Sequence, residues 1–498
     1  MTDHVDVLIV GAGLSGIAAA CHIQAKCPDR SFAILEARGA IGGTWDLFRY
    51  PGIRSDSDMF TLGFGFRPWP DAKAIADGPA IREYVRDTAR DHGVDEHIRF
   101  HHKVLRAEWS TADARWSVEC ERTDTGERVR LTSEFLFGCT GYYRYDEGFT
   151  PPLPGIERFG GEVVHPQHWS DDVDYAGKRV VVVGSGATAV TLVPAMAGEA
   201  EHVTMLQRTP SYVISLPNRD PVADLLRRTR LPDRIVHPIV KWKNVLLMMG
   251  SFQLSRRRPD LMKKLIRRGA LRMLPAGYEV DTHFNPPYNP WEQRLCLVPD
   301  GDLFEAIGRG DASIVTDRIA TFTERGIRLE SGRELEADLV VTATGLNLLA
   351  LGGMDLAVDG REIVLNDTIS YKGIMLSGVP NFAIALGYTN ASWTLKCELI
   401  CEYVCRLLNH MTEHGHRIAR PRDRDPSVPT QPFLDLQSGY VLRALAKFPR
   451  QGMAEPWRVH QNYVRDIRMM RHAPIGEGIE FSPGPAADGA AAPERLAA

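Results

Sequence analysis

The chain has 498 residues, more than one hydrophobic core accommodates, so we expect two or three domains. Its 44% hydrophobic and 24% charged residues are typical of a soluble globular protein, and no run of about 18 apolar residues predicts a membrane-spanning helix. A net charge of −4 argues against a general nucleic-acid-binding protein, and the N-terminus lacks the basic start of a secretory signal. Eight scattered cysteines without a Cys-x-x-Cys pair indicate the reducing cytoplasm.

The first motif is typical of a dinucleotide-binding fold. Residues 5–10 form an almost unbroken apolar run, which predicts a buried parallel strand before an Ala-rich helix. The loop between them is glycine-rich and contains Gly11, Gly13, Ser15 and Gly16. Glu36 ends the next predicted strand, about 20 residues after the loop, where a carboxylate binds the ribose hydroxyls of FAD or NAD. A tight turn without a ligand is the alternative.

An irregular stretch at residues 42–56 is dense in aromatic and charged side chains. If it covers a flavin, Trp45 stacks on the ring system while Arg54 and Asp56 bring charge to its reactive end. An ordinary surface loop is the alternative.

The next residues lead from this fold to a joint. Residues 98–138 predict a small antiparallel insertion, and residues 142–154, rich in Pro, Gly and Tyr, predict a linker. Residues 159–170 are too short and too broken by Gly and Pro for an ordinary helix. We interpret them as the joint between two nucleotide-binding folds.

A second dinucleotide motif follows the joint. Residues 179–183 predict another buried strand, and its loop contains Gly184, Ser185, Gly186, Thr188 and Ala189. The following strand ends at Gln207 and Arg208, in the zone that Glu36 occupies in the first fold. An arginine there suits a 2′-phosphate, so the sequence favours NADPH over NADH. A plain surface charge at Arg208 is the alternative.

Residues 221–293 interrupt the alternation of strands and helices and are expected to be helical. Between residues 221 and 273, fourteen lysines and arginines face three aspartates, with apolar residues interleaved. Basic amphipathic helices of this kind lie on anionic membrane surfaces, which predicts a peripheral membrane contact. A helical lid with solvated charges is the alternative.

The last third of the chain is expected to return to the first dinucleotide-binding fold. Strand-like patterning resumes at residues 314–341, and residues 378–393 begin the return. Cys397, Cys401 and Cys405 share one face of a predicted helix, and buried thiols of a core explain them better than a metal site. Beyond residue 481 the Pro-, Ala- and Gly-rich tail is expected to be disordered.

These motifs resemble a known family. The pattern Phe159-x-Gly161-x-x-x-His165-x-x-x-Trp169 is similar to the fingerprint of the Baeyer–Villiger monooxygenases, the class B flavoproteins. Residues 42–56, with Gly-Gly-x-Trp and Tyr-Pro-Gly-x-x-x-Asp, resemble that family's second fingerprint. More narrowly, residues 42–62, 288–298 and 387–396 resemble a mycobacterial branch that activates ethionamide. The similarity covers nearly the whole chain except the tail.

The resemblance implies site residues for both cofactors. FAD is expected at the first loop and at Ser15, Glu36, Thr44, Trp45 and Asp56, with the backbone of Val104 at the adenine. NADPH is expected at residues 184–189, Gln207 and Arg208, with Arg54 near the nicotinamide. Arg294 matches the family's active-site arginine, which Asp56 would orient.

Two residues depart from the family pattern. Ser170 stands where the fingerprint usually has Pro or Asp. Gln293 stands where many relatives have a lysine that helps to hold the 2′-phosphate, so NADPH selectivity would depend more strongly on Arg208.

The implied fold is α/β, with two Rossmann-like domains and a helical insertion. Residues 1–145 and 376–481 are assigned to the FAD-binding domain, and residues 146–220 and 294–375 to the joint and the NADPH-binding domain. Residues 221–293 form the insertion, and residues 482–498 form the tail.

The implied reaction is oxygenation by O₂ and NADPH through a flavin C4a-peroxide, turning ketones into esters or lactones, with S-oxygenation of thioethers or thioamides such as ethionamide as a related activity. Arg294 cannot lose its proton at working pH, so it would stabilise the peroxide and the substrate oxyanion. The fingerprint residues would couple domain rotation to the reaction, although a purely structural linker stays open. A monooxygenase restricted to heteroatoms is the nearest alternative. A disulfide reductase needs a cysteine pair beside the flavin, and a flavin-bound membrane adaptor would not react with NADPH.

Overall fold

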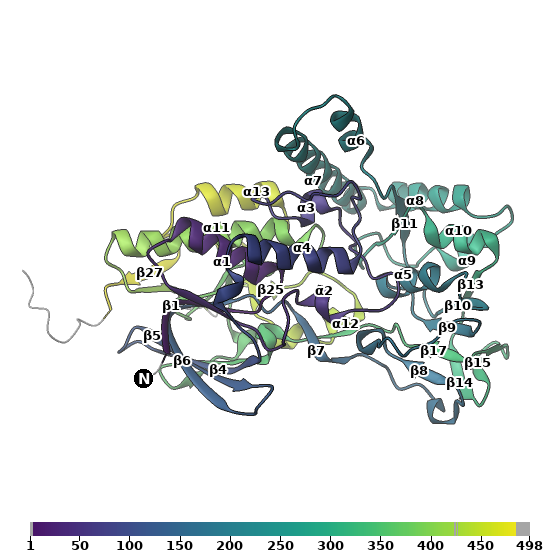
Figure 1. The fold of residues 1–498 in the computed structure, drawn as a ribbon, viewed down its shortest axis with the longest axis horizontal. Helices are drawn as coiled ribbons and strands as arrows, with labels where there is room; N and C mark the ends of the chain where they lie inside the picture. The colour runs from purple at the N-terminus through teal and green to yellow at the C-terminus, as the bar shows by residue number, and fades with distance from the viewer. Residues whose placement is uncertain (1–2, 423–424, 426, 485–498) are drawn as a thin grey trace, which may run out of the picture.

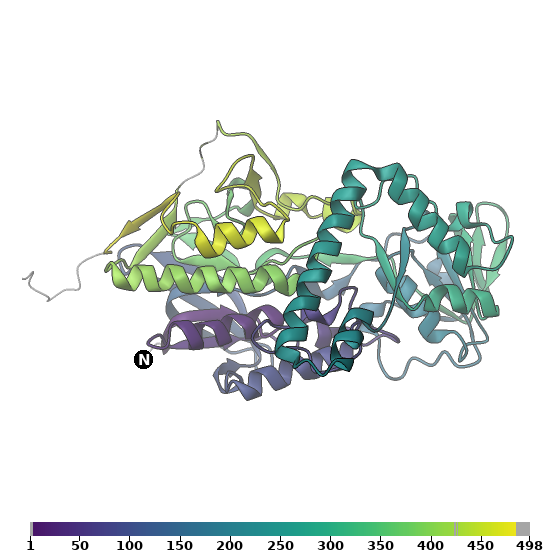
Figure 2. The same cartoon turned by 90° about the horizontal axis from the view of Figure 1, so that it is seen from above.

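Two units, each built on its own β-sheet, lie side by side, and a pair of long helices crosses between them (Figure 1; Figure 2). The computed structural model describes residues 3–422, 425 and 427–484. The predicted disordered tail begins within strand β27 (Ile479–Ser482), and its residues 485–498 lie outside the described part.

The first unit contains a nine-stranded sheet in the order β20-β19-β4-β5-β6-β1-β2-β3, with β23 also paired to β6. Its strands are β1 (Asp3–Val10), β2 (Phe32–Leu35), β3 (Ile98–Arg99), β4 (His102–Ser110), β5 (Arg115–Arg122), β6 (Arg128–Gly138), β19 (Asp355–Val358), β20 (Arg361–Glu362) and β23 (Phe382–Ile384). The apolar run at residues 5–10 lies in β1, between β2 and β6 and parallel to both. The predicted buried parallel strand is confirmed.

The antiparallel segment is part of this sheet rather than a separate insertion. β6 pairs antiparallel with β5 through its first half, and its second half pairs parallel with β23, while β1 runs along its other edge. A strand of 11 residues is long enough to serve both arrangements. β19 also pairs with β4, so the chain re-enters this sheet by residue 355, earlier than the predicted boundary at 376.

The second unit contains a five-stranded parallel sheet in the order β13-β10-β9-β17-β8. Its strands are β8 (Glu162–Val164), β9 (Arg179–Val183), β10 (His202–Gln207), β13 (Ala312–Thr316) and β17 (Leu339–Val341). β9 and β10 confirm the strands expected around the second glycine loop. The joint itself contributes β8, the edge strand of this sheet.

The first half of the predicted linker, residues 142–154, is a strand. β7 (Tyr143–Gly148) pairs antiparallel with β18 (Leu346–Leu348), and these two strands carry the chain between the units. None of the side chains of Tyr-Arg-Tyr-Asp-Glu-Gly is fully buried, and only Tyr143 packs against a hydrophobic core, so the sequence lacks the apolar pattern of a core strand.

Helices cover both sheets. In the first unit, α1 (Leu14–Lys26) packs against α11 (Trp393–Glu413), and all three cysteines of the α11 face are buried there. The second sheet is flanked by α5 (Ala187–Met196) and α10 (Asp302–Arg309). The remaining helices are α4 (Gly78–Asp91) and the short α2 (Thr44–Leu47), α3 (Met59–Leu62), α12 (Gly439–Leu442) and α13 (Tyr463–Ile467).

The insertion is helical as far as Met273. It contains α6 (Pro221–Arg228), α7 (Asp233–Arg257) and α8 (Pro259–Met273), whereas residues 274–293 hold only the single turn α9 (Val280–His283). α7 contacts α3 of the first unit, and α8 contacts β11 (Val213–Leu216), which pairs with β12 (Cys296–Pro299). The insertion therefore bridges both units (Figure 2). None of the described helices is long and apolar enough to span a membrane.

Small sheets complete the fold. They are formed by β14 (Ile319–Thr323), β15 (Gly326–Leu329) and β16 (Glu334–Glu336), by β21 (Ser370–Tyr371) with β22 (Met375–Leu376), by β24 (Ile418–Pro421) with β27, and by β25 (Thr430–Pro432) with β26 (Arg450–Gly452).

Asn381 ties several strands together just before β23. Its buried amide donates to the carbonyls of Glu134 and Arg417 at 2.9 and 2.8 Å and accepts from the Ala419 amide at 2.8 Å. Its φ of 46° lies in the left-handed region, which asparagine tolerates better than most residues.

We expect Asn381→Ala to lower the free energy of unfolding by about 3 kcal/mol, since three buried hydrogen bonds are lost at about 1 kcal/mol each. Urea unfolding measures the change. Asn381→Gly keeps the backbone conformation but loses the same bonds, so it should also destabilise, whereas Asn366→Ala should not. Wild-type stability in Asn381→Gly would contradict the role of the amide.

Candidate functional site

A continuous cavity of about 1370 Å³ lies between the two units and reaches both glycine-rich loops. Residues of the first sheet, of the 42–56 stretch, of the second glycine loop and of the segment after α9 line it. Most of the predicted site residues, although widely separated in sequence, are therefore brought together around one space.

The first loop is shaped by close backbone packing. Gly11 has a φ of 107°, and a Cβ there would lie 2.7 Å from the carbonyl oxygen of Cys139 at the end of β6. A Cβ on Gly16 would lie 1.8 Å from the Gly11 oxygen, so Gly16 is a packing residue inside α1 and does not line the cavity. The first amides of α1 lie beside the cavity without a side-chain cap, an arrangement that suits a pyrophosphate.

Glu36 is held at the end of β2 with its carboxylate at the cavity wall. Its two oxygens accept from the backbone amides of Ala12 and Arg38 at 2.8 and 2.9 Å. Burial raises the pKa of Glu36, and these two hydrogen bonds oppose that shift. Each carboxylate oxygen retains a free acceptor position, as ribose hydroxyls require.

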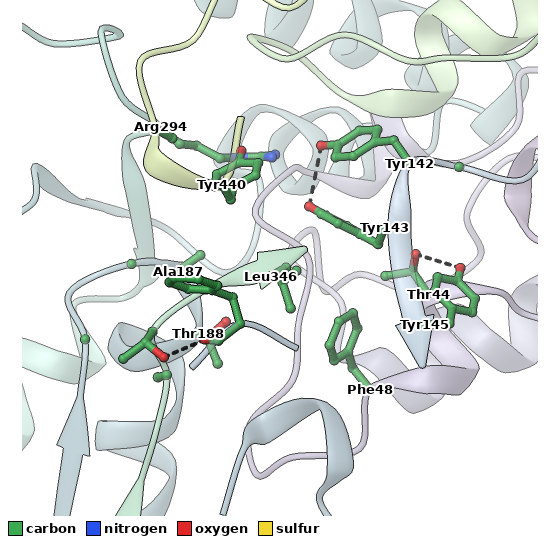
Figure 3. A pocket seen from close by; sticks show the side chains of 18 of the residues that line it. Thr44, Phe48, Tyr142, Tyr143, Tyr145, Ala187, Thr188, Arg294, Leu346 and Tyr440 are labelled. Carbon is green, nitrogen blue, oxygen red and sulfur yellow. Dashed lines mark hydrogen bonds between the residues drawn. The ribbon is translucent and has the colours of Figure 1, made fainter. Parts of the chain in front are cut away.

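Other predicted flavin contacts line the same part of the cavity: Ser15, Thr44, Trp45 and Val104. The Ser15 hydroxyl accepts from the Trp393 indole at 2.9 Å, and the hydroxyls of Thr44 and Tyr145 lie 3.3 Å apart (Figure 3).

Asp46 was missed by the sequence analysis, although it lies inside the 42–56 stretch. Its carboxylate is 2% exposed and faces four guanidinium groups, with separations of 2.7–3.7 Å, from Arg38, Arg49, Arg82 and Arg86. This cluster fixes the start of the stretch. Arg82 and Arg86 come from α4, so no local spacing signals the contact.

Arg294 and Asp56 form an ion pair at 2.6 Å in the middle of the cavity. Asp56 raises the pKa of the Arg294 guanidinium, while burial opposes the shift, so this side chain remains a cation. Arg294 extends toward Tyr142 and Tyr143, with Tyr440 beside it (Figure 3). Burial raises the pKa of Tyr143 to about 12, so its hydroxyl stays neutral at neutral pH.

Arg54, from the same stretch as Asp56, lines the cavity and pairs with Asp302 at the start of α10. The separation is 2.5 Å, and a second contact of 3.3 Å makes the pairing bidentate. Arg54 thus reaches the second unit, where the resemblance predicts the nicotinamide.

The second loop repeats the geometry of the first. Gly184 has a φ of 147°, and a Cβ there would lie 2.3 Å from the carbonyl oxygen of Ala343, just after β17. Gly186 has open space where its Cβ would stand. The Ser185 hydroxyl donates to the Thr209 carbonyl at 2.9 Å, and Thr188 also lines the cavity.

The residues predicted to bind NADPH beyond the second loop differ in whether they reach the cavity. Arg208 is exposed at the cavity wall, and no ion pair of it is recorded among the described residues. Gln207 is buried, donates to the His283 carbonyl and the Thr316 hydroxyl at 2.8 and 2.9 Å, and is not among the residues that line the cavity. Ala189 is likewise buried within α5 rather than at the cavity, whereas Gln293 lines it.

The fingerprint residues of the joint lie outside the cavity lining. Phe159 packs against Phe322, and a Cβ on Gly161 would lie 2.4 Å from the Asp338 oxygen. His165 bonds the Gly345 carbonyl at 3.2 Å, beside the β7–β18 crossing. Trp169 packs on the core of the second unit.

The donor set fits both nucleotides. Two uncapped helix starts face one cavity, the first loop with Glu36 for ribose hydroxyls and the second with Arg208 for a phosphate. The open space at Gly186 leaves room for a pyrophosphate against the backbone.

Comparison with known proteins agrees with this geometry. Residues 68–248 match the flavin-binding monooxygenase-like family, and residues 9–78 match the NAD(P)-binding Rossmann-like domain. The chain is 54% identical to the FAD-containing monooxygenase EthA of Mycobacterium tuberculosis, over 98% of this chain and 99% of that protein. It is 53% identical to the putative FAD-containing monooxygenase MymA of the same organism, over 99% and 100% of the two chains.

Solved structures share the fold. A steroid monooxygenase bound to NADP superposes with a TM-score of 0.73 at 21% identity, covering 96% of this chain and 99% of that one. A cyclohexanone monooxygenase superposes with a TM-score of 0.72 at 22% identity, covering 97% and 100%. The predicted α/β fold with two Rossmann-like units is confirmed. The chain belongs to the FAD-containing, NADPH-dependent monooxygenases, the class B flavoproteins that its fingerprints resemble.

Proposed function

We propose that this monooxygenase inserts one oxygen atom from O₂ into small ketones, giving esters or lactones, and also oxygenates sulfur in thioethers or thioamides such as ethionamide. The Arg294–Asp56 pair in the cavity between the two nucleotide loops carries the proposal. Its direct test is to incubate the FAD-loaded enzyme with NADPH, O₂ and a cyclic ketone and to identify the product. NADPH consumed with only hydrogen peroxide formed would overturn the proposal.

The chemistry that FAD would supply when bound is the acceptance of a hydride from NADPH and the activation of O₂. The chain's own contribution is a fixed positive charge, because a guanidinium paired with a carboxylate keeps its proton. Arg294 would stabilise the negative charge that develops on the substrate oxygen, and Asp56 would orient it. Tyr142, Tyr143 and Tyr440 flank the guanidinium.

The cysteines argue against a disulfide reductase. All eight are buried and free. Cys139 and Cys296 line the cavity, but burial raises the pKa of both thiols, of Cys296 to about 12, so neither is a ready thiolate. A heteroatom-restricted monooxygenase remains the second candidate, and the ketone assay separates the two.

We assign FAD to the unit that contains Gly11 and Glu36, and NADPH to the unit that contains Gly184 and Arg208. The joint would couple the two, since His165 contacts the crossing between the units while the fingerprint residues stay outside the cavity. We also propose that the enzyme works in the cytoplasm and touches a membrane peripherally through residues 221–293, where unpaired basic side chains and exposed apolar ones lie together.

We expect Arg294→Ala to lower the rate of ketone oxygenation by about 10²–10³, the usual cost of removing a preorganised donor of this kind. NADPH should still bleach the flavin in the absence of O₂, because hydride transfer does not need the substrate oxyanion. Product formation and anaerobic flavin reduction are measured side by side. Equal losses in both steps would show that Arg294 serves the nucleotide instead.

Gly186→Ala and Gly184→Ala form a matched pair. The Gly186 variant should fold normally with a full complement of FAD but bind NADPH more weakly, by about tenfold or more, because its new methyl group occupies open space in the cavity. The Gly184 variant should be destabilised, since its methyl group collides with the Ala343 carbonyl. Thermal unfolding and NADPH titration distinguish them, and normal NADPH affinity in Gly186→Ala would argue against a nucleotide at this loop.

Arg208→Gln should raise the KM for NADPH by about 10- to 100-fold and leave that for NADH unchanged, because a charged hydrogen bond to the 2′-phosphate is lost. Steady-state kinetics with the two nucleotides measure this ratio. Arg318→Gln, also at the cavity wall, serves as the matched control. Equal changes for NADPH and NADH in Arg208→Gln would contradict the assignment.

A further inference from the structure

An apolar stripe runs along the outer face of α7, the 25-residue helix of the insertion. Ile235, Ile239, Trp242 and Leu246 follow a 4-3-4 spacing, which places them on one helix face, and each is 42–59% exposed. Leu231, just before the helix, is also exposed. The opposite face is used for packing, since Val236 and Val240 are buried against the first unit.

Unpaired cations stand at both ends of the stripe. Arg228, Arg230 and Arg234 are exposed before it, and the run of arginines at residues 256–258 is exposed after it. None of these six takes part in an ion pair recorded among the described residues. Two of the nearby acids are neutralised, because Asp233 pairs with Arg227 and Asp224 pairs with Arg219. Asp260, just after the second group of arginines, is exposed and is the one acid among these helices without an ion pair recorded in the described part of the chain.

We propose that this face of α7 docks on a bilayer of anionic phospholipids, with the stripe in the acyl boundary and the arginines at the phosphates. This deepens the peripheral contact proposed above and is independent of the oxygenation chemistry. At about 1.5 Å per residue the helix is about 37 Å long and would lie in the interface plane.

The positive charge of this α7 face favours a membrane over a second copy of the chain as its partner. A two-fold pairing of α7 helices through the stripe would bring arginines of one copy against arginines of the other at both ends, and this repulsion disfavours a dimer. An anionic surface complements all six charges at once. The stripe also needs an apolar phase, which rules out a purely electrostatic partner such as a nucleic acid.

The test uses the full-length, FAD-loaded enzyme without NADPH and measures co-sedimentation with vesicles. Vesicles of phosphatidylcholine mixed with phosphatidylglycerol should bind it, and vesicles of phosphatidylcholine alone should bind it weakly. High salt should weaken the anionic binding, and Trp242 fluorescence should shift to shorter wavelength on binding.

Two variants separate the contribution of the arginines to vesicle binding from that of the apolar stripe. The triple variant Arg228→Gln, Arg230→Gln, Arg234→Gln should lose about a hundredfold in vesicle affinity, at about fivefold for each arginine near an anionic surface. The double variant Ile239→Ser, Leu246→Ser should lose about tenfold for each side chain that leaves the acyl boundary. Both should keep normal flavin content and NADPH oxidation.

Val364→Ser, at an equally exposed apolar residue far along the chain, and Arg361→Gln are the matched controls and should bind as the wild type does. Wild-type vesicle binding in both test variants would overturn the proposal, and so would the absence of binding to anionic vesicles. A concentration-dependent dimer that Ile239→Ser, Leu246→Ser abolishes, without vesicle binding, would overturn it in favour of self-association.

Discussion

Two ion pairs of opposite polarity join the 42–56 stretch to the second unit. Asp56 pairs with Arg294, and two residues earlier Arg54 pairs with Asp302. Because the signs alternate along the stretch, a slip of its backbone by two residues in either direction would bring like charges together at one of the two points. The two pairs therefore hold the 42–56 stretch against the second unit, and all four of these residues except Asp302 lie at the wall of the cavity.

The same kind of backbone contact positions both nucleotide loops. In each unit the first glycine of the loop lies against a carbonyl at the end of a neighbouring parallel strand, Cys139 for Gly11 and Ala343 for Gly184. Glycine is required at both positions because a Cβ would collide with the neighbouring carbonyl oxygen, whether or not a ligand is bound. The later glycine differs, because a Cβ on Gly186 would meet no atom within 4 Å.

Local patterns predicted the parts of the fold that depend on local chemistry. Both strand–loop–helix motifs, Glu36 and the helical insertion could be derived from apolar runs, glycine spacing and charge. The strand β7, the shared role of β6 and the return of the chain at β19 depend on pairing with distant segments, which no local pattern records. The same limit applies to the site. Gln207 sits at the predicted position in sequence, but its amide is taken by His283 and Thr316, and the arginines around Asp46 come from another helix.

The insertion contacts the first unit through α7 and the second unit through α8. Lys241 of α7 pairs with the buried Glu398 of α11, whereas α8 packs on the second unit at β11. Between the two helices there is a single corner, Arg258, which ends one helix and begins the other. The corner is therefore the place where the part of the insertion that contacts the first unit meets the part that contacts the second. The outer face of the α7–α8 pair is thus connected through one corner to both of the units that border the cavity.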